Sequence, residues 1–520
     1  MIKEEKILLG KSGDEDIFIY PKMANRHGMI AGATGTGKTV TLKVMAESFS
    51  SIGVPVFLAD VKGDIAPMCQ AGTDNPNVSE RVSSMGLDAA GFDYHAFPVN
   101  FWDVYGEKGM PLRTTISEMG PLLLSRVLGL NDTQSDVLTC IFKIADDENL
   151  ILTDTKDLKA MLNYVSDKSA EYGPKYGNIA TVTVNAILRS IVAIESEGAD
   201  LFFGEPALNV ADWLCTDRNG YGMVQILDCQ KLILHPRLYS AFLLWLISEL
   251  FESLPEVGDP EKPRVVFFFD EAHMLFDSAP KALLEKIEQL VKLIRSKGVG
   301  IYFITQNPSD IPDGVLAQLG NKVQHALHAY TPKEQKAVKA AAMGFRVNPE
   351  FDTYTTLQEL GTGKALVSVM GEDGIPTIVK HTKICPPQSS MGTLAESERI
   401  SNINNSVLYP KYYESVDNES AYELLARLES KPTENAKSEE EAMTLTEKMK
   451  KQLEEQEKKK KQPSALAKAS KSVAKTASGT IGREIGKTIG SSVGGKFGKT
   501  LGGNVGASLG RGLLDTLFKL

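Results

Sequence analysis

The sequence predicts an α/β protein with a mainly parallel central sheet, and three observations lead to this fold class. A short apolar run ends at Ala31 and is followed by a glycine-rich loop, then by apolar residues at helical spacing. Two further runs, Val54–Asp60 and Val265–Phe269, have the continuous hydrophobicity of strands buried on both faces. Acidic residues stand at the carboxyl end of each of these two runs, where parallel sheets bind ligands.

The glycine-rich loop reads GATGTGKT and matches the pattern G-x-x-x-x-G-K-T. Its glycines let the backbone turn so that amide groups point at phosphate oxygens, and the helix that starts at Gly37 adds its positive end. Lys38 is expected to reach the β- and γ-phosphates of ATP, and the Thr39 hydroxyl to bind Mg²⁺. The predicted nucleotide-binding residues are Gly32, Ala33, Thr34, Gly35, Thr36, Gly37, Lys38 and Thr39. A chance match is the alternative, but the strand before and the helix after favour a phosphate-binding loop.

The second diagnostic stretch is RVVFFFDEAH, in which five apolar residues end in Asp270 and Glu271. This is a Walker B pattern: Asp270 is expected to hold Mg²⁺, and Glu271 to orient or deprotonate the attacking water. Apolar strands that end in Asp-Glu are common. The Walker B prediction therefore depends on the presence of the glycine-rich loop in the same chain. The letters DEAH also suggest another helicase superfamily, but its companion motifs are not found.

Polar residues follow two other predicted strands. Gln306 ends the run Val299–Gln306, at the strand tip where P-loop ATPases place a γ-phosphate sensor; an ordinary polar strand end is the alternative. The segment DVKGD, from Asp60 to Asp64, either helps to hold Mg²⁺ or forms a polar turn in which Asp64 caps a helix. The later GTGKA at Gly361–Ala365 is not expected to be a second phosphate loop, because its glycines are too close together and Ser or Thr is missing.

Four regions are predicted from composition. Residues 1–385 form the ATPase core, with a large helical insertion at about 111–215 and no separate N-terminal domain. Residues 386–435 are an extension that opens on a linker, CPPQSSMG. Residues 436–475 hold 11 Lys and 7 Glu and predict a charged helix or coiled coil. Residues 436–520 together carry a net charge of +8. Because the whole chain carries −9, residues 1–435 carry −17.

The last region, 476–520, has glycine at every fourth position from Gly482 to Gly510, with an apolar residue before each. On a helix the glycines form a slowly spiralling groove beside an apolar ridge, which allows close contact with another helix or a membrane. Eight glycines cost roughly 6–8 kcal/mol of intrinsic helicity, so such a helix needs a lipid surface, a second copy or the protein body as its partner. A disordered basic tail is the alternative.

Composition also excludes some classes of protein. The five cysteines are scattered, which argues against a zinc ribbon or a disulfide framework and fits a reducing, cytoplasmic location. No run of 18 apolar residues is present, so no membrane span is expected, and the charged N-terminus does not read as a signal peptide. The acidic body does not favour wrapping DNA around its outside.

These motifs together resemble the HerA/FtsK group of P-loop motor ATPases, and more closely the HerA-like helicase C-terminal family of the YjgR type. The matching stretches span most of residues 8–428: RHGMIAGATGTGKT, FLADVKGDI, RTTISEMGPLLLSRVL, LNDTQ, FFFDEAH, LIRSKGVGIYFITQNPSDIP and VDNESAYELL. The resemblance implies a RecA-like sheet, ATP hydrolysis with Mg²⁺, and assembly into a homo-oligomeric ring, with a hexamer favoured. It also implies translocation or processing of double-stranded DNA.

The resemblance assigns roles to two arginines that the residues alone leave open. Arg26 stands twelve residues before Lys38 and matches the arginine that HerA-type motors place ahead of the loop; by itself it reads equally well as a surface charge. Arg295 matches the arginine that acts on a neighbour's ATP; by itself it is a cation suited to a helix C-terminus. Gln306 matches the family's sensor position.

The main functional hypothesis is therefore a Mg²⁺-dependent motor ATPase, in which Lys38, Glu271, Gln306, Arg295 and Arg26 serve catalysis and Thr39 and Asp270 bind the metal. The rival hypothesis is an ATP-controlled assembly or membrane-surface factor that acts through residues 476–520 without DNA. A metabolite kinase is a third reading, which the Glu271–Gln306 pattern disfavours because it fits hydrolysis better.

Overall fold

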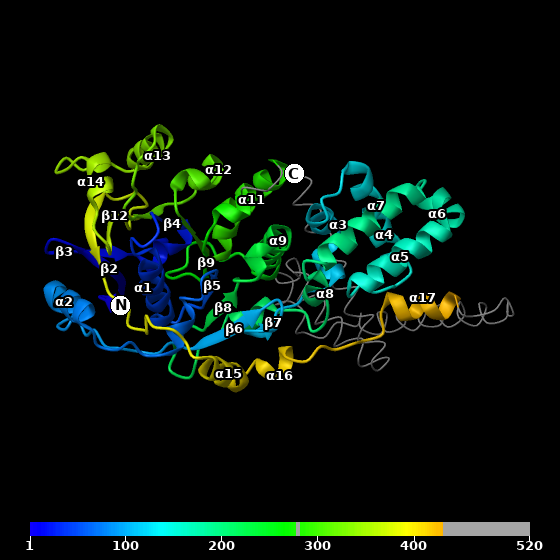
Figure 1. The fold of residues 1–520 in the computed structure, drawn as a ribbon, viewed down its shortest axis with the longest axis horizontal. Coiled ribbons are helices and arrows are strands. Elements are labelled where there is room, and N and C mark those ends of the chain that lie inside the picture. Colours follow the sequence, from blue (N-terminus) through cyan, green and yellow to red (C-terminus); the bar gives the residue numbers. More distant parts are fainter. Residues whose placement is uncertain (277–280, 430–520) are drawn as a thin grey trace, which may run out of the picture.

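The computed structural model describes residues 1–276 and 281–429. Their strands form one thirteen-stranded sheet in the order β1-β2-β13-β12-β11-β4-β10-β9-β5-β8-β6-β7, with β3 paired to β2. Helices surround this sheet, and a separate group of helices stands at one end of the molecule (Figure 1).

Eight neighbouring strands of the sheet run parallel. In sheet order they are β11 (Asn321–Gln324), β4 (Gly28–Ala31), β10 (Val299–Thr305), β9 (Val265–Phe269), β5 (Val56–Asp60), β8 (Val224–Asp228), β6 (Val99–Asp103) and β7 (Met110–Pro111). Every residue of β4, β10, β9, β5 and β8 is buried, as expected for strands covered on both faces. The prediction of a mainly parallel α/β sheet is therefore confirmed.

The sheet continues past β11 as an antiparallel end. Its strands are β12 (Lys364–Ser368), β13 (Lys380–Ile384), β2 (Lys6–Ser12), β3 (Glu15–Ile19) and β1 (Ile2–Lys3). The N-terminal strands are thus part of the main sheet, because β2 pairs with β13 from the far end of the core. Gly10 permits this pairing: a Cβ there would lie 2.3 Å from the Lys383 carbonyl oxygen.

The crossover helices of the parallel strands cover both faces of the sheet. Helix α1 (Lys38–Ser51) connects β4 to β5, whereas α9 (Pro236–Ser253) connects β8 to β9 in the opposite direction along the sheet. Because such crossovers are right-handed, α1 and α9 lie on opposite faces. Helix α11 (Lys281–Ile294) connects β9 to β10 in the same direction as α9 and packs against it.

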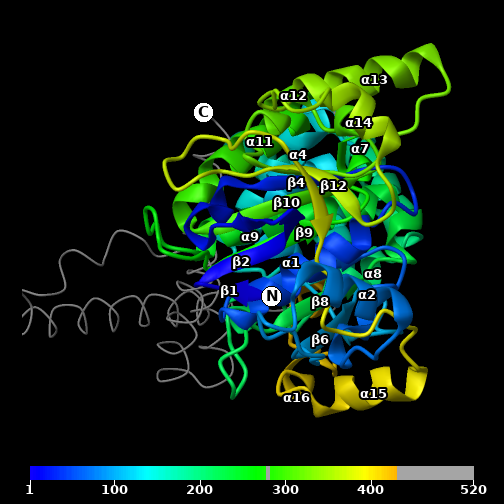
Figure 2. The ribbon, with the colours of Figure 1, turned by 90° about the vertical axis from the view of Figure 1, so that its left-hand side faces the viewer.

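Shorter elements complete the core. They are η1 (Pro21–Arg26), η2 (Ala66–Cys69), α2 (Pro76–Met85), η4 (Leu232–Leu234), α10 (His273–Phe276), η5 (Arg295–Lys297), η6 (Pro308–Asp310), α12 (Asp313–Leu316), α13 (Pro332–Met343) and α14 (Thr353–Glu359). Helices α13 and α14 enclose a second, smaller apolar cluster with β12 at one end of the sheet, and Figure 2 shows them at the opposite side from α15 and α16.

The helical block between β7 and β8 matches the range in which the sequence predicts helices. It comprises α3 (Ile116–Val127), α4 (Asp132–Asp147), α5 (Thr155–Asp167), α6 (Ser169–Tyr176), α7 (Thr181–Glu195), α8 (Ala199–Phe202) and η3 (Val210–Trp213). Asn131 and Gln134 form the capping box that starts α4, as the NDTQ motif indicates. The division of the chain into domains stays a prediction.

The segment CPPQSSMG differs from the exposed linker that its composition indicates. Glu47, buried on α1, accepts hydrogen bonds from the Gln388 and Ser389 amides at 2.8 and 3.1 Å and from the Ser389 hydroxyl. The buried Lys43 donates to the Ser390 carbonyl. Two charged side chains buried on one helix need polar partners, and this segment supplies them.

After that segment the chain forms α15 (Glu396–Asn405), α16 (Tyr409–Tyr412) and α17 (Ala421–Glu429), and α17 packs against α5. The charged region 436–475 and the glycine-repeat region 476–520 lie outside the described residues, so the predictions made for them stay predictions.

Candidate active site

The glycine-rich loop connects β4 to α1 at the carboxyl edge of the parallel strands. Gly35 and Gly37 have φ of 78° and 113°, values that residues with a Cβ rarely adopt. Gly37 is the N-cap residue of α1, and no side chain caps this helix. The first amide groups of α1 are therefore available to an anionic ligand, as a phosphate-binding loop requires.

Lys38 lies folded over the loop. Its Nζ donates to the carbonyl oxygens of Gly32 at 2.5 Å and Ala33 at 3.1 Å. Burial lowers the pKa of Lys38, and the nearby charge of Lys62 lowers it further, while Glu271 and Asp270 oppose these effects. An ammonium group in this setting is stabilised by added negative charge, which the phosphates of a nucleotide supply.

Hard oxygen ligands converge beside the loop. The Thr39 hydroxyl donates to Asp64 Oδ2 at 3.1 Å, and Asp270 follows β9 at the same sheet edge. Burial and the charge of Glu271 raise the pKa of Asp270 to about 6. Oxygen ligands and accumulated negative charge fit Mg²⁺, for which Thr39 and Asp270 remain the proposed ligands.

Asp60 plays a different part from Asp64. Both of its carboxylate oxygens accept backbone amides of its own turn, from Gly63 at 2.8 Å and Ile65 at 3.2 Å. Burial and the charge of Asp64 raise the pKa of Asp60 to about 7. Asp60 therefore shapes the turn after β5, and Asp64 is the member of the pair that faces Thr39.

Glu271 is held from both sides. Lys62 Nζ lies 2.9 Å from Glu271 Oε1, while Gln306 Nε2 and His273 Nδ1 lie 3.5 and 3.4 Å from Oε2. Burial raises the pKa of Glu271, but the hydrogen bond and charge of Lys62, together with His273 and Gln306, outweigh burial, so its pKa lies below the usual value. The carboxylate is thus kept anionic, the form that can accept a proton from water.

Gln306 lies where the sequence places it, immediately after β10 and beside Glu271. The structure therefore brings together Lys38, Thr39, Asp270, Glu271 and Gln306 at one edge of the sheet. Lys62 and His273 were not predicted as part of this group. The lysine in DVKGD was a signal, but only the pairing of β5 with β9 brings it to Glu271.

Two later segments support the loop from outside. The buried His325 contacts the Thr41 hydroxyl at 2.8 Å and the Lys364 carbonyl at 3.0 Å. Gly363, within the GTGKA segment, donates its amide to the Thr36 carbonyl at 3.0 Å. The GTGKA segment, which is not expected to bind phosphate, is therefore packed against the glycine-rich loop that precedes α1.

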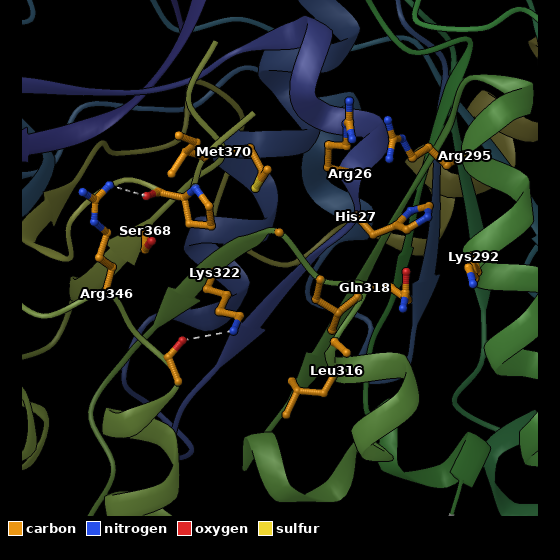
Figure 3. Close-up of a pocket in the computed structure, with 16 residues that line it drawn as sticks. Arg26, His27, Lys292, Arg295, Leu316, Gln318, Lys322, Arg346, Ser368 and Met370 are labelled. Atoms are coloured by element: carbon orange, nitrogen blue, oxygen red, sulfur yellow. Dashed lines mark hydrogen bonds between the residues drawn. The ribbon is translucent and has the colours of Figure 1, made fainter. Parts of the chain in front are cut away.

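Arg26 and Arg295 lie at the opposite, amino edge of the sheet. Arg26 ends η1 just before β4, and Arg295 begins η5 just before β10, so the parallel strands separate both from the loop of the same chain. Their guanidinium groups lie side by side in Figure 3, and both reach Asp259, at 3.7 and 3.4 Å. They line a cavity of about 640 Å³ that is also lined by Lys292, Lys322 and Arg346.

No single helix within residues 1–276 and 281–429 combines the length and apolarity needed to cross a membrane. One bent pair, α6 with α7 at 97°, passes that test by length and composition only.

Two curated relatives share part of this sequence. The DNA double-strand break repair helicase HerA of Sulfolobus acidocaldarius is 20% identical over 381 residues, covering 72% of this chain and 68% of that protein. A probable helicase of Methanocaldococcus jannaschii is 29% identical over 141 residues, covering 26% of this chain and 25% of that protein. The chain thus spans about a quarter of the length of the second relative.

Similar folds occur among solved structures. Plasmid coupling protein TrwB in complex with a non-hydrolysable ATP analogue has a TM-score of 0.49 and 16% identity, covering 76% of this chain and 92% of that one. VirB4 of Thermoanaerobacter pseudethanolicus has a TM-score of 0.46 and 18% identity, covering 74% and 97%. The family model described as helicase HerA-like C-terminal matches residues 5–500. The chain belongs to the helicase HerA-like C-terminal family.

Proposed function

We propose that this protein is a Mg²⁺-dependent ATPase that works as an oligomeric motor on double-stranded DNA. The observation that carries the proposal is the convergence of Lys38, Asp270, Glu271 and Gln306 on the edge of the sheet where the loop turns. Membership of the HerA-like family supports it.

Each residue has a role in this reaction. The loop amides and Lys38 bind the phosphates, and Glu271 accepts a proton from the attacking water. Gln306 contacts the γ-phosphate and shares a hydrogen bond with Glu271. Thr39 and Asp270 would hold Mg²⁺, which would neutralise negative charge on the phosphate oxygens.

The arginines support a ring. Because Arg26 and Arg295 lie at the edge opposite their own loop, they can act only on a nucleotide bound by another copy. A closed head-to-tail ring, with a hexamer favoured, places the amino edge of one subunit against the carboxyl edge of the next. Arg295→Ala should assemble and bind ADP normally but lose turnover. Full turnover by the assembled variant would remove this role.

DNA as the substrate is proposed from the relatives, since one of them is named as a DNA repair helicase. Residues 1–435 carry a net charge of −17, which disfavours DNA on the outer surface and favours contact inside a ring. The test is steady-state ATP hydrolysis with and without double-stranded DNA, with Glu271→Gln as the blank. Stimulation that disappears in the blank supports a DNA motor; activity indifferent to DNA contradicts it.

A second function is favoured by one observation, the four-residue glycine period of region 476–520. In this alternative the protein is an ATP-controlled assembly or membrane-surface factor, and the repeat is its effector. Flotation of the full chain and of residues 1–475 with anionic liposomes separates the two functions. Equal behaviour of both proteins contradicts the lipid role.

A further inference from the structure

Lys62 occupies a turn that the structure holds firmly. The turn follows β5 and is closed by the Asp60 carboxylate, which accepts the Gly63 and Ile65 amides. Gly63 has φ of 80°, and Asp64 receives the Thr39 hydroxyl on the other side. The base of the Lys62 side chain is therefore anchored to the sheet and to the start of α1.

The partner of Lys62 is a glutamate in an uncommon backbone conformation. Glu271 has φ of 47°, in the left-handed region that residues other than glycine seldom adopt. Such a conformation persists where surrounding contacts determine it. Two contacts of the Glu271 carboxylate are of this kind. Lys62 follows β5 and Gln306 follows β10, and these two strands flank β9 on either side.

An ordinary surface ion pair does not describe these contacts. The Lys380–Glu15 pair, at 2.7 Å, has side chains 30% and 56% exposed, whereas the Glu271 side chain is only 10% exposed. Lys62 itself is 42% exposed, so the pair joins a largely buried carboxylate to a partly exposed lysine.

We propose that Lys62 is a positioning residue that aims the Glu271 carboxylate at the attacking water. This inference rests on the proposed ATPase function. Lys62 fixes one carboxylate oxygen, so the other oxygen, shared with Gln306, faces the reacting phosphate. Without Lys62 the carboxylate keeps only the longer contacts of Oε2 with Gln306 and His273, at 3.5 and 3.4 Å. Misplacement of a reacting group by about 1 Å can cost about a hundredfold in rate.

The test measures kcat and KM for ATP, and ADP affinity, in Lys62→Ala, Lys62→Arg and the control Lys380→Ala. Lys62 is 42% exposed, so its replacement leaves the core intact. We expect Lys62→Ala to lower kcat between about tenfold and a hundredfold, with KM and ADP affinity within about threefold. Lys62→Arg, which keeps the charge and a donor, should restore most of kcat, and Lys380→Ala should match wild type.

A double-mutant cycle with Glu271→Gln separates positioning from a structural role. If Lys62 acts through Glu271, adding Lys62→Ala to Glu271→Gln should lower the remaining rate by less than about twofold. Additive losses, an unchanged or raised kcat in Lys62→Ala, or loss of ADP binding would each overturn the inference. Wild-type turnover equal to that of Glu271→Gln would instead overturn the ATPase function, and this inference with it.

Discussion

His27 makes the stability of the protein depend on pH in a defined direction. This residue is buried at the C-terminal end of η1, where Nε2 contacts the Val291 carbonyl at 2.7 Å and Nδ1 accepts the Ile301 amide at 3.1 Å. Burial lowers its pKa to about 4; the Val291 carbonyl opposes this effect, and the charge of Arg295 adds to it. The imidazole thus stays neutral in the folded protein well below the pH at which it is protonated in the unfolded chain.

The magnitude follows from linkage. An unfolded histidine titrates near pH 6.5, so between pH 6.5 and pH 4 the unfolded chain binds a proton that the folded protein does not. The contribution of His27 to the free energy of unfolding is therefore complete above pH 6.5 and falls as the pH drops toward 4. At pH 5, which lies about 1.5 units below the pKa of the unfolded histidine, the protein has lost about 2 kcal/mol of the free energy of unfolding that it has at pH 8, at about 1.36 kcal/mol per unit.

The assay compares urea unfolding of wild type and His27→Asn at pH 8 and pH 5. Asparagine tolerates the positive φ of 55° at this position but cannot titrate. We expect His27→Asn to be less stable than wild type at pH 8. The difference in the free energy of unfolding between the two proteins should be about 2 kcal/mol smaller at pH 5. All other titrating groups are common to both proteins and cancel. The exposed His328→Asn is the control for loss of an imidazole, and a gap for His27→Asn that is equal at both pH values would refute the reasoning.

Two further predictions concern α1 and the loop. Glu47→Ala leaves the Gln388 and Ser389 donors without their acceptor in a buried site, and should lower the free energy of unfolding by about 3–5 kcal/mol; a urea midpoint unchanged from wild type would contradict this. Gly32→Ala places a Cβ 2.5 Å from His325 Cβ, and should weaken ADP binding by at least about tenfold in a fluorescence titration. Gly361→Ala meets no atom within 4 Å and is its control.

Much of the sheet edge that carries the glycine-rich loop could be predicted because its signals are local. Residues 29–51 contain strand, loop and helix in one uninterrupted stretch, and the structure has β4, the loop and α1 in that order. The apolar run before Asp270 predicts β9 for the same reason, since a continuous hydrophobic segment of that length suits a strand buried on both faces. The position of Gln306 at the end of a strand could be predicted for the same reason, because the apolar run that precedes it is a local signal.

The contacts that surround these residues are not local, and the sequence could not provide them. Lys62 meets Glu271 because β5 pairs with β9, although more than two hundred residues separate them in the chain. The segment CPPQSSMG reads as a linker, yet residues 385–390 are largely buried, because Lys43 and Glu47 of α1 need their polar groups. The helical spacing of apolar residues predicted α1 but could not show which segment of the chain packs against it.

The fold class, the glycine-rich loop and the acidic residues after β9 could be predicted from the chain alone, because short-range periodicity and glycine placement dictate those elements. The order of the strands could be learned only from the folded protein. That order brings Lys62 and Gln306 to either side of Glu271 and carries Arg26 and Arg295 to the far edge, away from their own loop. The physical reason is that strand pairing is chosen by packing among distant segments, and no window along the chain contains that information.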